Sequence, residues 1–164
     1  TYIYFWHDQG YDIDLMNISA EKLEGQHDFV NFSKKNPDVK SSIRSIDNIV
    51  IELQNNLLIF RFSALSWLWE QCRRMVTHLL EVGSKKSSPE DTDKLLASPC
   101  VKKPSPAPPE FLLLEKIDYA DINFNIDKNA LKYIQNYFHN KYSSFVSRAG
   151  LFKKIWEYYH EYSS

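Results

Sequence analysis

The chain has 164 residues, of which 43% are apolar, 15% aromatic and 25% charged, and its formal net charge is −1. This apolar content argues against a disordered chain, and the length suffices for one domain with a small appendage. The sequence has no apolar run of about eighteen residues, so no membrane span is predicted. The two cysteines, Cys72 and Cys100, have no disulfide or metal-ligand pattern, so we expect no metal and a reducing cytoplasmic environment.

The first quarter of the chain predicts a strand, a helix and a turn. Residues 2–6 are aromatic and β-branched, as in a strand. Residues 14–24 carry apolar side chains at helical spacing and are followed by a glycine, which predicts a helix. Residues 27–32 predict a tight turn or short helix, and the polar, basic residues 34–42 predict an exposed loop.

The middle of the chain predicts a hairpin and then helices. Residues 46–53 and 57–62 are strand-like and are separated by two asparagines, which tolerate the positive φ of a tight turn. Residues 65–82 carry an apolar stripe at helical spacing, and we expect one helix over the whole segment. A second helix is predicted to start near Pro89 and to end near residue 97.

The last part of the chain predicts one strand and two helices. Residues 111–117 are almost entirely apolar, so we expect a central strand of the sheet. Residues 127–142 and 147–162 predict two aromatic-rich helices. Together the elements predict an α+β fold, with a mostly antiparallel sheet of about four strands, helices on one face, and a C-terminal helical extension.

Several motifs in order resemble the tRNA pseudouridine synthase A family. Residues 2–4 resemble its R-Y-x-Y strand, and residues 25–32 its G-x-H-D-F-x-x-F turn. Residues 60–76 resemble its F-x-A-x-x-F-L-x-x-M-V-R helix, and residues 107–119 its A-P-P-x-G-L-x-L-x-x-V-x-Y segment. The resemblance covers residues 1–119 and leaves residues 120–164 unmatched, so we expect a catalytic-half domain and a helical extension.

The resemblance implies isomerisation of uridine to pseudouridine without a cofactor or metal. It assigns Arg73 as the cation beside a catalytic aspartate, Tyr2 as the ring-stacking residue and proton-transfer candidate, and Leu112 as the side chain that packs on uracil. From the residues alone, Arg73 could equally be a surface arginine with a buried stem, and Tyr2 and Leu112 plain core residues. The turn residues His27 and Asp28 are expected to be structural, with Asp28 as a cap.

Substrate binding is expected from a basic strip. Residues 33–104 hold twelve Lys and Arg against eight acidic residues, a segment charge of 12 − 8 = +4. Four of these cations, Lys34, Lys35, Lys40 and Arg44, are assigned to the tRNA backbone, although Arg44 could instead hold its own loop. By resemblance the substrate is the anticodon stem-loop, around tRNA positions 38–40, and the enzyme is a homodimer.

One family motif has no counterpart in the sequence. The G-R-T-D-x-G-V-H segment with the nucleophilic aspartate does not occur, and the chain begins directly on a strand-like run. We therefore expect that the N-terminal half is missing, and that this chain alone is inactive. Two alternatives remain open, namely a non-catalytic RNA-binding module and a protein-interaction domain that uses its aromatic C-terminal segment.

Overall fold

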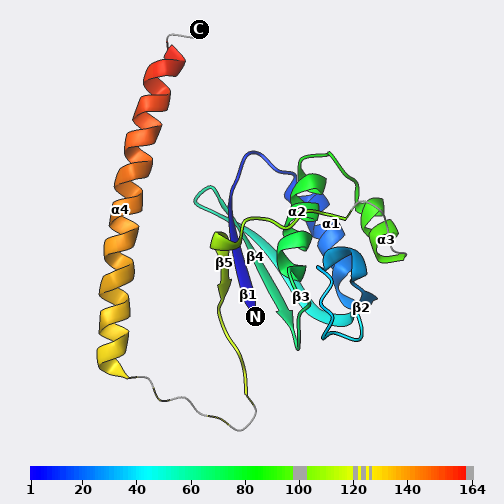
Figure 1. The fold of residues 1–164 in the computed structure, drawn as a ribbon. Helices are drawn as coiled ribbons and strands as arrows, with labels where there is room; N and C mark the ends of the chain where they lie inside the picture. The colour runs from blue at the N-terminus through cyan, green and yellow to red at the C-terminus, as the bar shows by residue number, and fades with distance from the viewer. Residues whose placement is uncertain (98–102, 120–121, 123–124, 126, 162–164) are drawn as a thin grey trace. The chain divides into compact units, whose positions relative to one another are not determined.

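The computed structural model describes residues 1–97, 103–119, 122, 125 and 127–161. The chain divides into two compact units, Thr1–Asp118 and Tyr119–Ser164, and each is described by itself. The first unit is α+β, as the sequence predicts (Figure 1). Its elements are β1 (Tyr2–His7), α1 (Ile13–Leu23), β2 (Gly25–Asp28), a 3-10 turn (Val30–Phe32), β3 (Ile43–Gln54), β4 (Leu57–Ala64), α2 (Gln71–Gly83), α3 (Pro89–Ala97), a second 3-10 turn (Pro109–Phe111) and β5 (Leu112–Leu114).

The five strands form one antiparallel sheet in the order β2-β3-β4-β1-β5. The predicted hairpin is confirmed, because β3 and β4 pair along their length and turn through Asn55 and Asn56, which both have positive φ. Strand β1 lies between β4 and β5, with Tyr4 opposite Phe60 on one side and opposite Leu112 on the other. Segments from both ends of the unit therefore meet at one edge of the sheet.

The hydrophobic core lies between the sheet and the helices. Side chains alternate across a strand, and Tyr4, Phe60 and Phe62 are fully buried in a cluster with residues of α1 and α2. Figure 1 shows these two helices lying against the sheet. The rings of Phe60 and Phe62 stack with centroids 6.4 Å apart. A buried polar chain links three helices on this side: His78 Nε2 lies 2.8 Å from Thr92 Oγ1, which donates to Ser19 Oγ.

One strand prediction is wrong, and the prediction of a turn or short helix at 27–32 is confirmed only in part, by the 3-10 turn at Val30–Phe32. Residues 111–117 do not form a central strand: only Leu112–Leu114 is a strand, and it lies at the edge of the sheet. Leu112 packs on the core, whereas Leu113 and Leu114 are exposed, as expected for an edge strand with a neighbour on one side. The predicted turn at 27–32 is partly the edge strand Gly25–Asp28, whose polar residues pair with β3 and raise the strand number to five.

The helix predicted over 65–82 begins six residues later than expected, at Gln71. Glu70 has φ +67°, a left-handed conformation that a right-handed helix cannot contain. Leu65 continues the apolar spacing of the helix but is 97% exposed. Residues 65–70 therefore form a separate segment, which brings its tryptophans to the start of α2.

In the described part of the second unit, one helix, α4 (Lys128–Glu161), takes the place of the two predicted. The expected break at residues 143–146 contains no proline or glycine, and the helix passes through it. Ser147 Oγ donates to the Ser143 carbonyl (2.9 Å), so this hydroxyl bonds within the helix. Among the described residues, no helix combines the length and apolar character needed to cross a membrane.

Candidate functional site

A cavity of about 350 Å³ brings together the three residues assigned to the reaction. Tyr2 comes from β1, Arg73 from the first turn of α2, and Leu112 from β5, and all three line this cavity. Strands β1 and β5 pair directly, which fixes Tyr2 and Leu112 on neighbouring strands. The remaining lining comes from the segment Trp67–Cys72. We call this space the arginine cavity.

Arg73 is held in place from two directions. Its side chain is 17% exposed, and Nη1 donates to the Ala107 carbonyl at 2.7 Å. Nη2 lies 3.7 Å from Glu70 Oε1, which is an ion pair without a short hydrogen bond. A guanidinium has five N–H donors in a planar fork. Since the bond to Ala107 and the ion pair with Glu70 use few of them, Arg73 can donate to a further carboxylate.

Glu70 is a part of this site that sequence reasoning missed. Its side chain is 12% exposed and accepts two hydrogen bonds from Arg74, at 3.1 Å from Nε and 2.6 Å from Nη2. Arg74 Nη1 also donates to the Pro104 carbonyl. The sequence signal was available, because Glu70 precedes the two arginines at the i+3 and i+4 spacings that bring charges together.

Aromatic rings form one wall of the arginine cavity. The rings of Tyr2 and Trp67 meet edge to face, with centroids 6.1 Å apart. Tyr4, two residues along β1, faces the core and donates its hydroxyl to the Pro108 carbonyl at 3.0 Å. Burial and the charge of Glu110 raise the pKa of Tyr4 to about 12, although the charge of Arg73 opposes this. Tyr4 is therefore a protonated structural residue, and Tyr2 is the tyrosine that lines the cavity.

The predicted basic strip is partly assembled. Lys34, Lys35 and Lys40 line a second cavity of about 280 Å³, together with Lys103, which the sequence analysis did not single out. We call it the lysine cavity. Arg44 does not line it: Nη1 donates to the carbonyls of Ser41 and Ile43, so this guanidinium holds its own loop.

Two other sequence predictions concern Asp28 and the cysteines. Asp28 caps the following turn, as predicted, since Oδ1 accepts the Val30 N–H at 3.0 Å. Cys72 is buried and free, and burial raises the pKa of its thiol. Cys100 lies outside the described residues. Within the part of the chain that the structure describes, no three His, Cys, Asp or Glu side chains are grouped to hold a metal ion.

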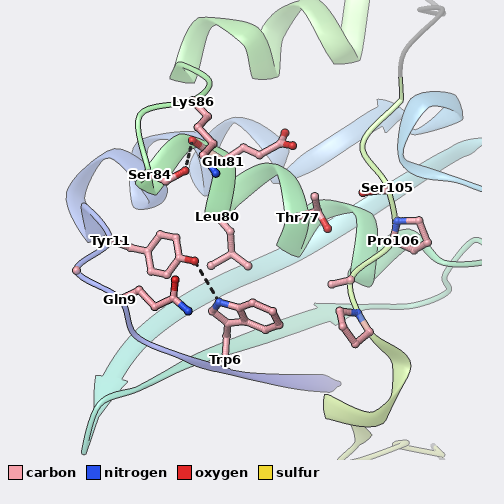
Figure 2. A pocket seen from close by; sticks show the side chains of 13 residues that line it. Trp6, Gln9, Tyr11, Thr77, Leu80, Glu81, Ser84, Lys86, Ser105 and Pro106 are labelled. Atoms are coloured by element: carbon pink, nitrogen blue, oxygen red, sulfur yellow. Dashed lines mark hydrogen bonds between the residues drawn. The ribbon is translucent and has the colours of Figure 1, made fainter. Parts of the chain in front are cut away.

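A further cavity of about 550 Å³ contains none of the predicted site residues. Figure 2 shows Trp6 and Tyr11 at its centre, where the indole Nε1 donates to the Tyr11 hydroxyl at 3.2 Å. Thr77 and Leu80 of α2 and the loop at Ser105 and Pro106 complete the lining drawn there (Figure 2).

The first unit of the protein is thus an α+β domain in which the arginine cavity lies beside the lysine cavity. A family profile described as tRNA pseudouridine synthase matches residues 19–120. Proteins called tRNA pseudouridine synthase A are similar over much of the chain: that of Thermococcus gammatolerans is 33% identical over 152 residues, covering 93% of this chain and 57% of its own length. The Archaeoglobus fulgidus protein is 33% identical over 137 residues, covering 83% and 52%.

The chain belongs to the tRNA pseudouridine synthase family. It spans about half the length of the curated relatives it matches. A relative from Thermoplasma volcanium, also called tRNA pseudouridine synthase A, is 35% identical over 121 residues, which is 74% of this chain and 46% of that protein.

Proposed function

We propose that this chain is the C-terminal half of a tRNA pseudouridine synthase that isomerises uridine in the anticodon stem-loop. The observation that carries the proposal is the arginine cavity, in which Tyr2, Arg73 and Leu112 meet. The names of the relatives supply the reaction class. The proposal includes a homodimeric, cytoplasmic enzyme, as the family resemblance implies.

The reaction breaks the N1–C1′ bond of uridine and forms a C5–C1′ bond, while the C5 proton leaves and N1 gains a proton. A carboxylate near the sugar acts as nucleophile or base. Arg73 keeps that carboxylate ionised and oriented through paired N–H donors. Tyr2 stacks on the ring and takes part in transfer of the C5 proton, and Leu112 packs against the uracil once it is flipped from its stack.

The reacting carboxylate comes from outside this chain. Glu70 is the carboxylate that lines the arginine cavity, and its oxygen already accepts two hydrogen bonds from Arg74. Arg73 remains available to a second carboxylate, and the family supplies one as an aspartate in a motif that this sequence lacks. We therefore expect the isolated 164-residue chain to be inactive.

The test measures tritium release from tRNA labelled at C5 of uridine. It uses the complete gene product, meaning the protein translated from the whole open reading frame that encodes this chain. Release that is lost in Arg73→Ala, but kept in a control such as Arg61→Ala, would support the proposal. Arg61 is a suitable control because it pairs with Glu52, which lies outside both cavities.

Absence of release from folded complete gene product would overturn the synthase proposal. Salt-dependent tRNA binding without release would then favour a non-catalytic RNA-binding module. Absence of both release and tRNA binding would favour a protein-interaction domain, and the exposed aromatic side chains of α4 would be the surface to examine.

A further inference from the structure

The lysine cavity combines several lysines with an exposed tryptophan and has no acidic residue in its lining. Four of its eleven lining residues are lysines, and none is acidic. Its apolar lining includes Trp69, whose side chain is 55% exposed. Exposed tryptophan beside several cations requires an explanation, because an indole on the surface loses the burial that normally stabilises it.

Trp69 is positioned by the backbone and by a lysine. The Lys34 N–H donates to the Trp69 carbonyl at 3.0 Å, which fixes two segments far apart in the sequence side by side. The Lys34 ammonium lies 4.6 Å from the centroid of the indole ring, within the range of a cation–π contact. Lys103 is fixed on another side, where Nζ donates to the Val30 carbonyl. The cations and the ring are therefore arranged before any ligand arrives.

Among the described residues, no carboxylate forms an ion pair with a lysine of this cavity, although Asp38 lies in the same loop. Asp28 accepts hydrogen bonds from the Val30 N–H and from the hydroxyl of Ser42, so it is committed to its own turn. Glu70 is paired with Arg74. An anion entering the lysine cavity would thus meet positive charge, and its negative charge would be attracted over several ångströms.

The lysine cavity adjoins the arginine cavity. Leu68 and Trp69 line both, so the two spaces lie on either side of one short segment. An RNA strand with one nucleotide in the arginine cavity would pass this segment and could place the next nucleotide in the lysine cavity. The exposed indole suits a flat ring and the lysines suit a negative charge, and each nucleotide of RNA carries both.

We propose that Trp69 and the lysines of this cavity bind an unstacked nucleotide of the RNA next to the target uridine. Its base stacks on the indole, and its phosphate contacts Lys34 and Lys103. Single-stranded nucleic acids are held in this manner, by aromatic rings that accept any base and cations that follow the backbone. An acidic peptide would use the lysines alone and would leave the exposed ring unexplained. The inference rests on the proposed function, since the target uridine is assumed to enter the arginine cavity.

The experiment is a double-mutant cycle between protein and RNA. The complete gene product is titrated into a fluorescent anticodon-arm hairpin, and into hairpins with an abasic site on the 5′ or the 3′ side of the target uridine. An abasic site removes the base and keeps the phosphate. Trp69→Ala should weaken binding of the intact hairpin by roughly tenfold or more. It should have little effect on one of the two abasic hairpins, and Trp69→Phe should restore most of the affinity.

Charge controls separate stacking from general attraction. Lys103→Gln should lower the dependence of binding on salt, because one phosphate contact is lost. Lys86→Gln, which removes an exposed lysine of another cavity, should change affinity less. Equal affinity of wild type and Trp69→Ala for all three hairpins would overturn the inference. An acidic peptide that displaces the hairpin as well as unlabelled RNA does would also overturn it.

The binding experiment and the tritium-release experiment can fail independently of each other. Tritium release combined with binding that is independent of Trp69 would overturn the nucleotide site and leave the synthase. Binding that depends on Trp69, without tritium release, would overturn the synthase and leave an RNA-binding site. Circular dichroism of each variant would show whether a lost affinity reflects a lost fold.

Discussion

Arg73 and Ala107 are joined by two hydrogen bonds, one from each residue. The Ala107 N–H donates to the Arg73 carbonyl at 3.1 Å, and Arg73 Nη1 donates to the Ala107 carbonyl at 2.7 Å. The first bond fixes the loop on the helix, and the second uses that loop to orient the guanidinium. A carbonyl acceptor does not neutralise the positive charge of Arg73, and the ion pair with Glu70 is long at 3.7 Å, so the guanidinium can still bind a carboxylate.

Arg73→Lys should therefore lose activity although it keeps the charge. A lysine ammonium has no planar fork and cannot hold Ala107 and a carboxylate in the same geometry. We expect tritium release to fall by about a hundredfold or more, and stability by about 1 kcal/mol for the lost carbonyl contact. Arg61→Lys, on an exposed ion pair, should leave tritium release unchanged. Full activity of Arg73→Lys would contradict this prediction and would show that a positive charge at position 73 is sufficient for the reaction.

Periodicity predicted the core of this fold better than it predicted its boundaries. The apolar stripe of α2 continues toward the N-terminus as far as Leu65. Apolar spacing gives no sign of a single residue with positive φ, such as Glu70, after which the helix begins. The apolar residues 111–117 predict a central strand, yet β5 has a neighbour on one side only, and Leu113 and Leu114 are exposed while Leu112 packs on the core. An apolar run therefore indicates neither the burial of each side chain nor the position of a strand in its sheet.

The candidate site was predictable where it follows a motif and unpredictable where it depends on tertiary contacts. Tyr2 and Arg73 were found from motif order. Trp69 and Lys103 were missed, since their proximity depends on a backbone hydrogen bond from Lys34 and on a loop that returns to the 3-10 turn. Arg44 resembled its basic neighbours in sequence, but its guanidinium turns to its own loop.

Glu70 should stabilise the fold through Arg74 despite its backbone strain. Removing one partner of a largely buried pair leaves the other charge uncompensated, so Glu70→Ala should lower the free energy of unfolding by about 3 kcal/mol. Glu70→Gly loses the same ion pair, but glycine adopts the positive φ at this position without strain. Glu70→Gly should therefore be about 1 kcal/mol more stable than Glu70→Ala. Urea unfolding of the two variants measures the difference. Equal stabilities would show that the positive φ carries no strain.

The buried His78 should make stability depend on pH. Burial lowers the pKa of His78 from 6.5 to about 4, although the charge of Asp91 opposes the shift. The unfolded chain gains a proton as pH falls below 6.5, whereas the folded chain stays neutral until about pH 4. Stability should therefore be full above pH 6.5 and should fall by about 3 kcal/mol as pH drops toward 4.

Urea unfolding at pH 7.5 and pH 4.5 would check this loss. His78→Gln removes the titrating group, so its stability should change less between the two pH values, whatever its stability at neutral pH. A loss of equal size in His78→Gln would assign the pH dependence to other groups. The bond to Thr92 satisfies Nε2 in the folded state, so a neutral imidazole is buried without an unpaired nitrogen at that position.

Two glycines in helices should respond to alanine in opposite directions. A Cβ at Gly83 would lie 2.5 Å from Met16 Sδ and 3.1 Å from Tyr11 Cβ. Met16 is fully buried and has little space to move, so Gly83→Ala should destabilise the fold by about 1–3 kcal/mol. A Cβ at Gly150 in α4 meets nothing within 4 Å, so Gly150→Ala should stabilise that helix by about 0.5–1 kcal/mol. Urea unfolding measures the first change, and the thermal loss of helical circular dichroism measures the second. A Gly83→Ala variant as stable as wild type would mean that α1 can shift Met16 away from α2 at no cost, which the close packing of these helices argues against.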